Sequence, residues 1–338
     1  MEFESIPPSL TSKELLDKAF SRASRSGRAK YGVQAQRSML KISSNILSDN
    51  LENIVKSWPN FDLVHPFYYE LADIIVSVDD IRKSLGALQW ASNTTREIGR
   101  EYQISMLGSD LDYARTLRKQ AFARMSSILR RVSKDLIFLS EAREPLRHLP
   151  SINPETPTIV VAGYPNVGKS SFVNITTNAR NEIASYPFTT RGIMVGHIER
   201  NYIRYQLIDT PGLLDRSVSN RNDIEKQAIS ALKHLANCIL FFIDASETCG
   251  YTLEHQQHLS EELTSQLGIP LITVCTKSDL STNVTSDYYM SILPDSTSIS
   301  KTSNEVSVEL KTPEQILTEA VKYLNDHPKA INTQDENQ

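Results

Sequence analysis

The chain has 338 residues and a formal net charge of −4, with 40% hydrophobic and 22% charged residues. These values are ordinary for globular proteins and exclude collagen-like, disordered and disulfide-stapled classes. Its length suggests two domains or one large one. The three cysteines, Cys238, Cys249 and Cys275, lack metal-type spacing and fit a reducing cytosol. We expect no secretory signal in the first residues, MEFESIPPSL, and no apolar run is long enough to span a bilayer.

Charge divides the chain unevenly. Residues 1–150 carry 22 Lys and Arg against 18 Asp and Glu, whereas the remainder carries 14 against 22. The first part is therefore positive, either by chance or because it faces an anionic partner. Residues 145–157 contain four prolines and no apolar periodicity, which is typical of a linker. We expect a helical bundle over residues 1–155, an α/β domain over residues 156–326 and a polar tail over residues 327–338.

Apolar residues recur at helical spacing before the linker. Thr11 and Glu14 form a predicted capping box at the start of a first helix. Further apolar stripes run through residues 40–54, 67–88 and 114–139. Amphipathic helices of this length pack as an antiparallel bundle.

Two groups of basic residues lie in the same region. One surrounds the turn at Gly27, and the other lies on the last helix, mostly opposite its apolar stripe. Their members are Arg22, Arg25, Arg28, Lys30 and Arg37, then Arg115, Arg118, Lys119, Arg124, Arg130, Arg131 and Lys134. They indicate either a solvated surface or contact with an RNA backbone, which would make binding salt-dependent.

A glycine loop follows the first apolar strand of the second domain. Residues 158–162 are apolar and β-branched, and residues 163–170 match the pattern G-x-x-x-x-G-K-[ST] before a helix. Backbone N–H groups of such a loop, and the helix N-terminus, bind phosphate oxygens. We expect Lys169 to reach the β- and γ-phosphates and Ser170 to ligate Mg²⁺. The predicted phosphate-binding residues are Gly163, Tyr164, Pro165, Asn166, Val167, Gly168, Lys169, Ser170 and Ser171.

Two more strands end in polar motifs. The strand over residues 203–208 leads into Asp209 and Gly212, at the edge where open α/β sheets bind ligands. We expect Asp209 to hold Mg²⁺ through water and the Gly212 N–H to detect a γ-phosphate. The strand over residues 269–275 precedes Thr276, Lys277 and Asp279. An Asp there can accept from N1–H and the 2-amino group of guanine, whereas adenine lacks this donor pair.

Together these motifs resemble the G-protein fold of translation-factor-class GTPases. The resemblance implies a P-loop G domain with a six-stranded, mainly parallel sheet, helices on both faces, and one antiparallel edge strand near residues 194–199. It implies that Lys277 covers the base and that Ser300 and Lys301 complete the guanine site. Thr276 stands where this motif more commonly carries Asn, so we expect guanine to bind, with an affinity that can be weaker.

Three segments narrow the resemblance further. Residues 182–190, 209–215 and 246–256 look like those of the nucleolar GTP-binding protein family, which is Obg-related. The resemblance implies GTP and GDP binding and a role in assembly of the large ribosomal subunit. The helical bundle would dock on ribosomal RNA or protein. The chain looks like the shorter archaeal type, which implies a cytoplasmic location and no membrane partner.

Residues of the predicted switch segments and of the glycine loop bear on the rate of GTP hydrolysis. Thr190, or alternatively Thr189, is expected to close onto Mg²⁺ when a γ-phosphate is present. Leu213 stands where many GTPases carry a Gln that orients the attacking water, so we expect slow intrinsic hydrolysis. Asn166 occupies the position that ligates K⁺ in related potassium-dependent GTPases, or else it only stabilises the loop. The alternative function is a GTP-binding scaffold with negligible hydrolysis.

Overall fold

The computed structural model describes residues 3–177, 181–184, 186, 192–215, 221–278, 280, 284–290 and 310–327. The chain forms two compact units. Unit 1 comprises Met1–Val64 and Ile75–His148, and unit 2 comprises His65–Ile74 and Leu149–Gln338. Within the described ranges, every helix is too short or too polar to cross a bilayer.

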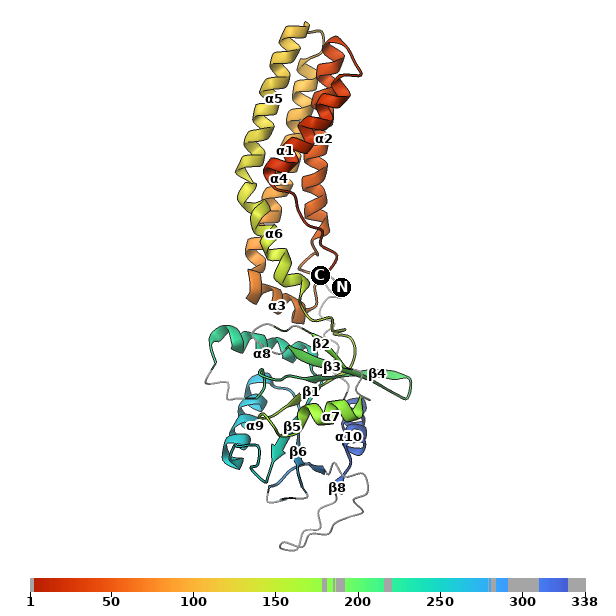
Figure 1. Ribbon diagram of the computed structural model, residues 1–338, viewed down its shortest axis with the longest axis vertical. Coiled ribbons are helices and arrows are strands. Elements are labelled where there is room, and N and C mark those ends of the chain that lie inside the picture. The colour runs from red at the N-terminus through yellow and green to blue at the C-terminus, as the bar shows by residue number, and fades with distance from the viewer. Residues whose placement is uncertain are drawn as a thin grey trace, which may run out of the picture. The chain divides into compact units, whose positions relative to one another are not determined.

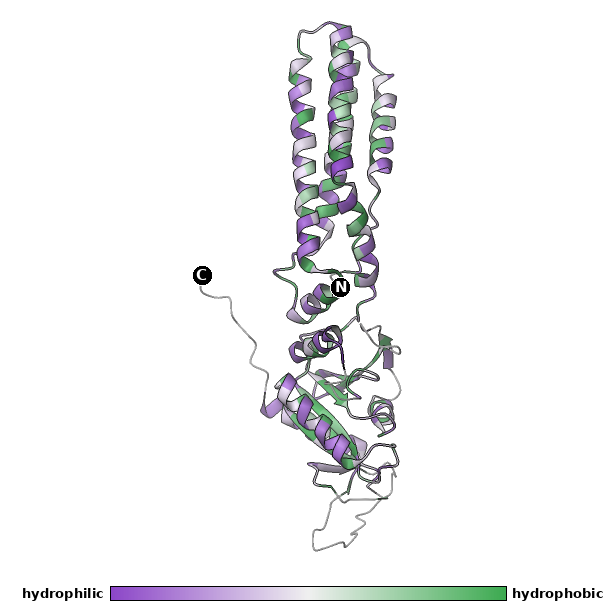
Figure 2. Ribbon diagram, turned by 90° about the vertical axis from the view of Figure 1, so that its left-hand side faces the viewer, coloured by the Kyte–Doolittle hydropathy of each residue, from purple (hydrophilic) through white to green (hydrophobic). Residues whose placement is uncertain are grey.

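Unit 1 is a bundle of amphipathic helices, as expected. Its helices are α1 (Ser12–Gly27), α2 (Gly32–Ser57), α4 (Val78–Ser105), α5 (Leu111–Arg131) and α6 (Ser133–Arg147) (Figure 1). Helix α2 packs against α1, α4 and α5. Figure 2 shows hydrophobic and hydrophilic bands alternating along these helices, as amphipathic helices require. The predicted capping box is confirmed, because Thr11 accepts from the Glu14 N–H and the Glu14 carboxylate accepts from the Thr11 N–H.

Two apolar stripes that read as continuous in the sequence are each divided. Residues 67–88 form α3 (Pro66–Val76) and α4, because Ser77 between them takes a left-handed φ of 57° and caps α4. Residues 114–139 form α5 and α6, which separate at Val132. The spacing of apolar residues indicates which side of a helix is buried, but it does not show whether the helix is continuous. The apolar pattern therefore continues across the helix breaks at Ser77 and Val132.

The first part of α3 belongs to unit 2. The Tyr68 hydroxyl donates to the carbonyl oxygens of Pro150 and Ile152, at 2.8 and 2.6 Å, and accepts from the Ile152 N–H at 3.0 Å. Glu70 pairs with Lys233 and His234 at 3.2 and 2.8 Å. A segment from the predicted helical domain thus packs within the second unit.

Unit 2 is built on a sheet. Among the described residues it has eight strands in the order β2-β3-β4-β1-β5-β6-β7-β8. The strands are β1 (Thr158–Ala162), β2 (Asn181–Ala184), β3 (Ile193–Arg200), β4 (Ile203–Asp209), β5 (Cys238–Asp244), β6 (Leu271–Thr276), β7 (Tyr288–Met290) and β8 (Leu310–Lys311). Strand β3 runs antiparallel to β2 and β4, and the other pairs are parallel.

The mainly parallel sheet and its antiparallel strand were expected, but six strands were predicted. Three strands were not located in the sequence: β2, β7 and β8 have four, three and two residues, too few to show a periodic pattern. Because β2 lies beyond β3, the antiparallel strand is not at the edge.

Helices cover both faces of the sheet. They are α7 (Lys169–Thr176), α8 (Asp223–Leu235), α9 (Leu253–Leu267) and α10 (Pro313–Asp326). Helix α7 contacts α10 and α8 contacts α9, and Figure 1 shows the two pairs on opposite sides of the strands. Strands β1 and β5 are buried throughout, as a covered parallel sheet requires. Val161 of β1 pairs with Asp209 of β4, so the carboxyl ends of these strands lie side by side.

Candidate nucleotide-binding site

The glycine loop leaves the sheet at Gly163. This residue has a φ of 133°, and a Cβ atom there would lie 2.6 Å from the Phe242 carbonyl oxygen. Close approach of the backbone therefore requires glycine. Asn166 and Gly168 also take positive φ angles, 63° and 100°, and α7 begins directly afterwards. The loop thus curls in front of a helix N-terminus, where the helix dipole favours an anion.

Lys169 is folded into this loop. Its side chain is almost buried, and its Nζ atom donates to the carbonyl oxygens of Gly163 and Tyr164, both at 2.7 Å. Burial lowers the pKa of Lys169, whereas the negative charges of Asp209 and Asp215 oppose this shift. The loop therefore holds a cation in its interior, where phosphate oxygens would need one.

Ser170, at the start of α7, meets Asp209, at the end of β4. The Ser170 hydroxyl donates to Asp209 Oδ2 at 2.5 Å. Asp209 is fully buried, and its other oxygen, Oδ1, has no hydrogen-bond partner among the described residues. Burial raises the pKa of Asp209, and Ser170 and Lys169 oppose that shift. An unpaired buried carboxylate oxygen is costly, and carboxylate and hydroxyl oxygens suit a hard divalent cation. The two side chains therefore fit a Mg²⁺ ion.

The segment after Asp209 lies against the glycine loop. The Gly212 N–H donates to Asp215 Oδ2 at 2.8 Å, and the Leu214 carbonyl accepts from the Gly163 N–H at 3.1 Å. Arg221 donates to the Gly212 carbonyl at 3.3 Å and lies 3.7 Å from Asp215 Oδ1. Leu213 is 1% exposed, so its side chain packs in the core.

The loop after β6 is held against β5. The Thr276 hydroxyl donates to the Ile243 carbonyl at 3.3 Å, and Lys277 takes a left-handed φ of 51°. The Lys277 amine donates to Asp244 Oδ2 and to the Thr248 hydroxyl, both at 2.7 Å. The position of the Lys277 side chain is therefore fixed by residues at the end of β5, and not by β6, the strand that precedes it.

Asp244 was not identified from the sequence. It is fully buried and also accepts from the backbone N–H groups of Ser246 and Cys249, at 3.0 and 2.8 Å. Burial alone would raise the pKa of Asp244, but hydrogen bonds from Lys277, Ser246, Thr248 and Cys249 outweigh it and lower the pKa to about 2. Its sequence signal was an acidic residue ending an apolar strand, the feature that identified Asp209.

Two tyrosines join the glycine loop to the loop after β5. The rings of Tyr164 and Tyr251 lie 4.1 Å apart between centroids. Gln256 on α9 donates to the Tyr251 carbonyl at 2.9 Å and accepts from the Asp244 N–H at 2.8 Å. This arrangement connects the predicted phosphate loop to the strand end that holds Lys277.

The structure places the other predicted residues as follows. Asn166, Ser170 and Ser171 are exposed on the loop and the start of α7, whereas Val167 is buried. The remaining predicted residues, Thr189, Thr190, Asp279, Ser300 and Lys301, lie outside the described residues.

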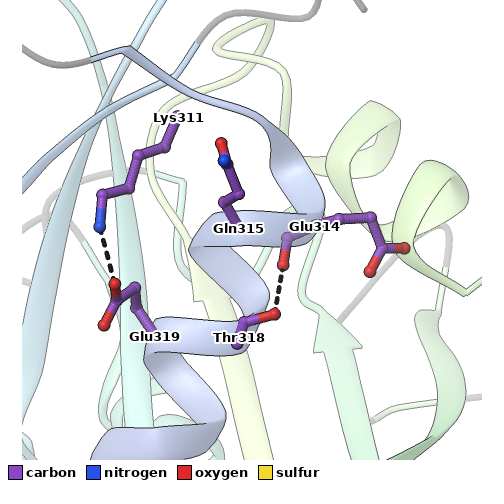
Figure 3. A pocket seen from close by; sticks show the side chains of 5 residues that line it. All are labelled: Lys311, Glu314, Gln315, Thr318 and Glu319. Atoms are coloured by element: carbon purple, nitrogen blue, oxygen red, sulfur yellow. Dashed lines mark hydrogen bonds and ion pairs between the residues drawn. The ribbon is translucent and has the colours of Figure 1, made fainter.

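A separate hollow lies at the start of α10 (Figure 3). It is lined by Lys311, Glu314, Gln315, Thr318 and Glu319. Lys311 pairs with Glu319 at 2.7 Å, and the Thr318 hydroxyl donates to the Glu314 carbonyl at 2.8 Å. None of its lining residues was predicted to bind a ligand, and its two carboxylates are already paired, Glu314 with Arg200 and Glu319 with Lys311. The glycine loop is therefore the stronger candidate site.

Comparisons with known proteins agree with both units. The family model for the NOG1 N-terminal helical domain matches residues 3–153, and the model for nucleolar GTP-binding protein 1 (NOG1) matches residues 223–279. An uncharacterized protein of Methanocaldococcus jannaschii is 44% identical over 238 residues, which are 70% of this chain and 67% of that protein.

Eukaryotic relatives are longer. Nucleolar GTP-binding protein 1 of Drosophila melanogaster is 40% identical over 245 residues, covering 72% of this chain and 38% of the relative. Its Arabidopsis thaliana counterpart is 40% identical over 232 residues, covering 68% and 35%. The chain thus spans well under half the length of these two relatives.

Proposed function

The chain belongs to the nucleolar GTP-binding protein 1 family, and we propose that it is a Mg²⁺-dependent switch that binds and hydrolyses GTP. The observation that carries the proposal is the convergence of three groups at one edge of the sheet. Lys169 lies inside the glycine loop, and Ser170 and Asp209 meet beside it with one carboxylate oxygen unpaired.

The loop's own groups account for phosphate binding in this proposal. Lys169 exchanges its two carbonyl partners for phosphate oxygens, and the α7 N-terminus adds its partial positive charge. Ser170 and Asp209 would hold Mg²⁺, which would supply positive charge against the phosphates of the nucleotide. Thr190, or alternatively Thr189, completes the site when the γ-phosphate is present.

In this proposal the loop after β6 recognises the base. Lys277 lies with its amine fixed by Asp244 and Thr248, which leaves its aliphatic part to cover a base. Asp279 accepts from guanine, and Ser300 and Lys301 close the site. Thr276 supports this loop through β5, in place of the commoner Asn.

Hydrolysis is slow in this proposal. Leu213 is 1% exposed and apolar, so it offers the attacking water no hydrogen bond. Asn166 is exposed on the loop, where we propose that it ligates K⁺ to supply additional positive charge. The burial of Leu213 also favours the second candidate function, a scaffold whose bound GTP is structural.

The helical unit is the proposed docking element for the large ribosomal subunit or its precursor. Residues 18–48 and residues 113–134 each carry seven Lys and Arg and no Asp or Glu. The Phe20 and Phe122 rings stack at 4.4 Å between centroids, and Arg118 donates to the Gln36 side chain at 2.8 Å. These contacts join α1, α2 and α5, so the basic segments lie on neighbouring helices, and their positive charges would attract ribosomal RNA phosphates. The cytoplasmic location stays a prediction, tested by cell fractionation.

Nucleotide binding tests the core of the proposal. Titration with GTP, GDP and ATP, with and without Mg²⁺, should show guanine preference and tighter GTP binding with the ion. Ser170→Ala should remove the gain from Mg²⁺. Ser265→Ala, an exposed serine on α9, is the matched control and should behave as wild type. Absence of GTP binding by the wild type would overturn the proposal.

Gradient co-sedimentation tests the partner. The chain should migrate with large ribosomal subunits or their precursors in a non-hydrolysable GTP analogue and dissociate in GDP. Stimulated multiple turnover would favour the switch, whereas stable binding without turnover would favour the scaffold. Failure to associate in either state would contradict the ribosomal role.

A further inference from the structure

The carboxylate of Asp215 accepts a hydrogen bond from the Gly212 N–H, the backbone group that we assign to γ-phosphate detection. The Gly212 N–H donates to Asp215 Oδ2 at 2.8 Å, and Asp215 is largely buried, with its side chain 17% exposed. A carboxylate and a phosphate oxygen are both anionic acceptors, so they compete for one donor.

The same carboxylate also lies within electrostatic reach of the glycine loop. Burial lowers the pKa of Lys169, and the charge of Asp215, together with that of Asp209, opposes the shift. The Leu214 carbonyl bonds the Gly163 N–H at 3.1 Å, which holds the segment before Asp215 against the loop. Asp215 therefore acts on two groups that a γ-phosphate would use, the Gly212 N–H and the Lys169 amine.

Arg221 holds this arrangement in place. Its guanidinium is 1% exposed, donates to the Gly212 carbonyl at 3.3 Å and lies 3.7 Å from Asp215 Oδ1. The arginine thus binds both partners of the Gly212–Asp215 hydrogen bond. If the Asp215 carboxylate moved away from the Gly212 N–H, the Arg221 guanidinium would remain beside it. The displaced carboxylate would therefore not be an unpaired buried charge.

We propose that Asp215 sets the discrimination between GTP and GDP, as an internal anion that occupies the Gly212 N–H until a γ-phosphate displaces it. This inference rests on the proposed function. GDP leaves the Gly212–Asp215 bond intact, whereas GTP must break it. Asp215 therefore lowers the affinity for GTP relative to GDP and makes the γ-phosphate move the segment that carries Gly212.

The test compares the affinities of two nucleotides for the full chain. Isothermal titration calorimetry with Mg²⁺ measures binding of GDP and of the β,γ-imido analogue of GTP to the wild type, Asp215→Asn and Asp215→Ala. Hydrogen bonds to charged groups contribute about 1.5 kcal/mol or more, so Asp215→Ala should raise the ratio of GTP-analogue to GDP affinity about tenfold. Asp215→Asn keeps an uncharged acceptor of similar size and should raise the ratio by less.

The control is Asp223→Asn, which removes a 95% exposed carboxylate at the start of α8 and should leave the ratio unchanged. Retained GDP binding by the Asp215 variants shows that the site is folded. A ratio that stays constant or falls in both variants overturns the inference and leaves nucleotide binding intact. A wild type that binds neither nucleotide overturns the proposed function itself.

Discussion

The amine of Lys277 lies 2.7 Å from Oδ2 of Asp244, so the predicted base-binding loop is fastened to the end of a neighbouring strand. Asp244 is fully buried and accepts from Ser246, Thr248 and Cys249 as well. A carboxylate with this many donors is stabilised in its charged form. The pair therefore ties the position of Lys277 to the folded state of unit 2.

Acid should weaken the protein through Asp244. Its pKa in the folded chain is about 2, below the ordinary value of 3.8. A lowered folded pKa means stabilisation that is present above pH 4 and is lost as the pH falls towards 2, amounting to about 2 kcal/mol. Asp244→Asn should remove this part of the acid dependence. Urea unfolding at pH 7 and pH 3 measures it, and a variant as acid-sensitive as the wild type would contradict the assignment.

Gly163→Ala should destabilise unit 2 by about 2 kcal/mol or more, because φ is 133° there and the new Cβ atom meets the Phe242 carbonyl at 2.6 Å. Gly86→Ala is the matched control. Gly86 lies within α4 with open space around its Cβ position, so alanine there should stabilise the helix by about 0.5–1 kcal/mol. Thermal unfolding compares the two, and equal effects would contradict the close approach at Gly163.

Tyr68→Phe should loosen the attachment of α3 within unit 2. The hydroxyl bonds two carbonyls and the Ile152 N–H, all buried, and its loss leaves these groups without that partner. We expect a cost of about 1–3 kcal/mol in the free energy of unfolding. Tyr202→Phe, at a 99% exposed tyrosine, should cost nothing measurable. Hydrogen exchange of the Ile152 amide should rise only in the first variant.

GTP turnover should be faster in KCl than in NaCl at equal concentration. If Asn166 ligates K⁺, the added charge near the phosphates should raise the rate by about tenfold or more. Asn166→Ala should make the rates in the two salts equal, because the variant lacks the side chain that would ligate K⁺. Equal wild-type rates in both salts would remove K⁺ from the proposal.

Binding of the helical unit to RNA should depend on salt. Each phosphate contact contributes about 0.9 to the slope of log affinity against log salt, so Arg25→Gln with Arg28→Gln should lower that slope by about two. Arg82→Gln, on α4 and paired with Asp62, is the control and should leave the slope unchanged. Fluorescence anisotropy with a ribosomal RNA fragment measures it, and an unchanged slope in the double variant would favour a solvated surface.

Short-range features could be predicted from the sequence because their parts are adjacent in the chain. The glycine loop, its lysine and the helix that follows lie within a few residues, and backbone geometry alone places them together. The capping box at Thr11 and Glu14 and the amphipathic stripes of the bundle are local for the same reason. Local spacing therefore determined the class of each unit and the phosphate-binding loop.

Contacts between segments that are far apart in the chain could not be predicted and became visible in the folded chain. Asp244 and Lys277 are 33 residues apart and are joined by the parallel register of β5 and β6. Tyr68 lies in a helix that read as part of the bundle, yet its hydroxyl binds the segment around Ile152. Gly163 and Leu214 are far apart in the chain, and the pairing of β1 with β4 brings the glycine loop against the segment that carries Gly212 and Asp215. Such contacts depend on strand register and packing, and no local pattern in the chain encodes either.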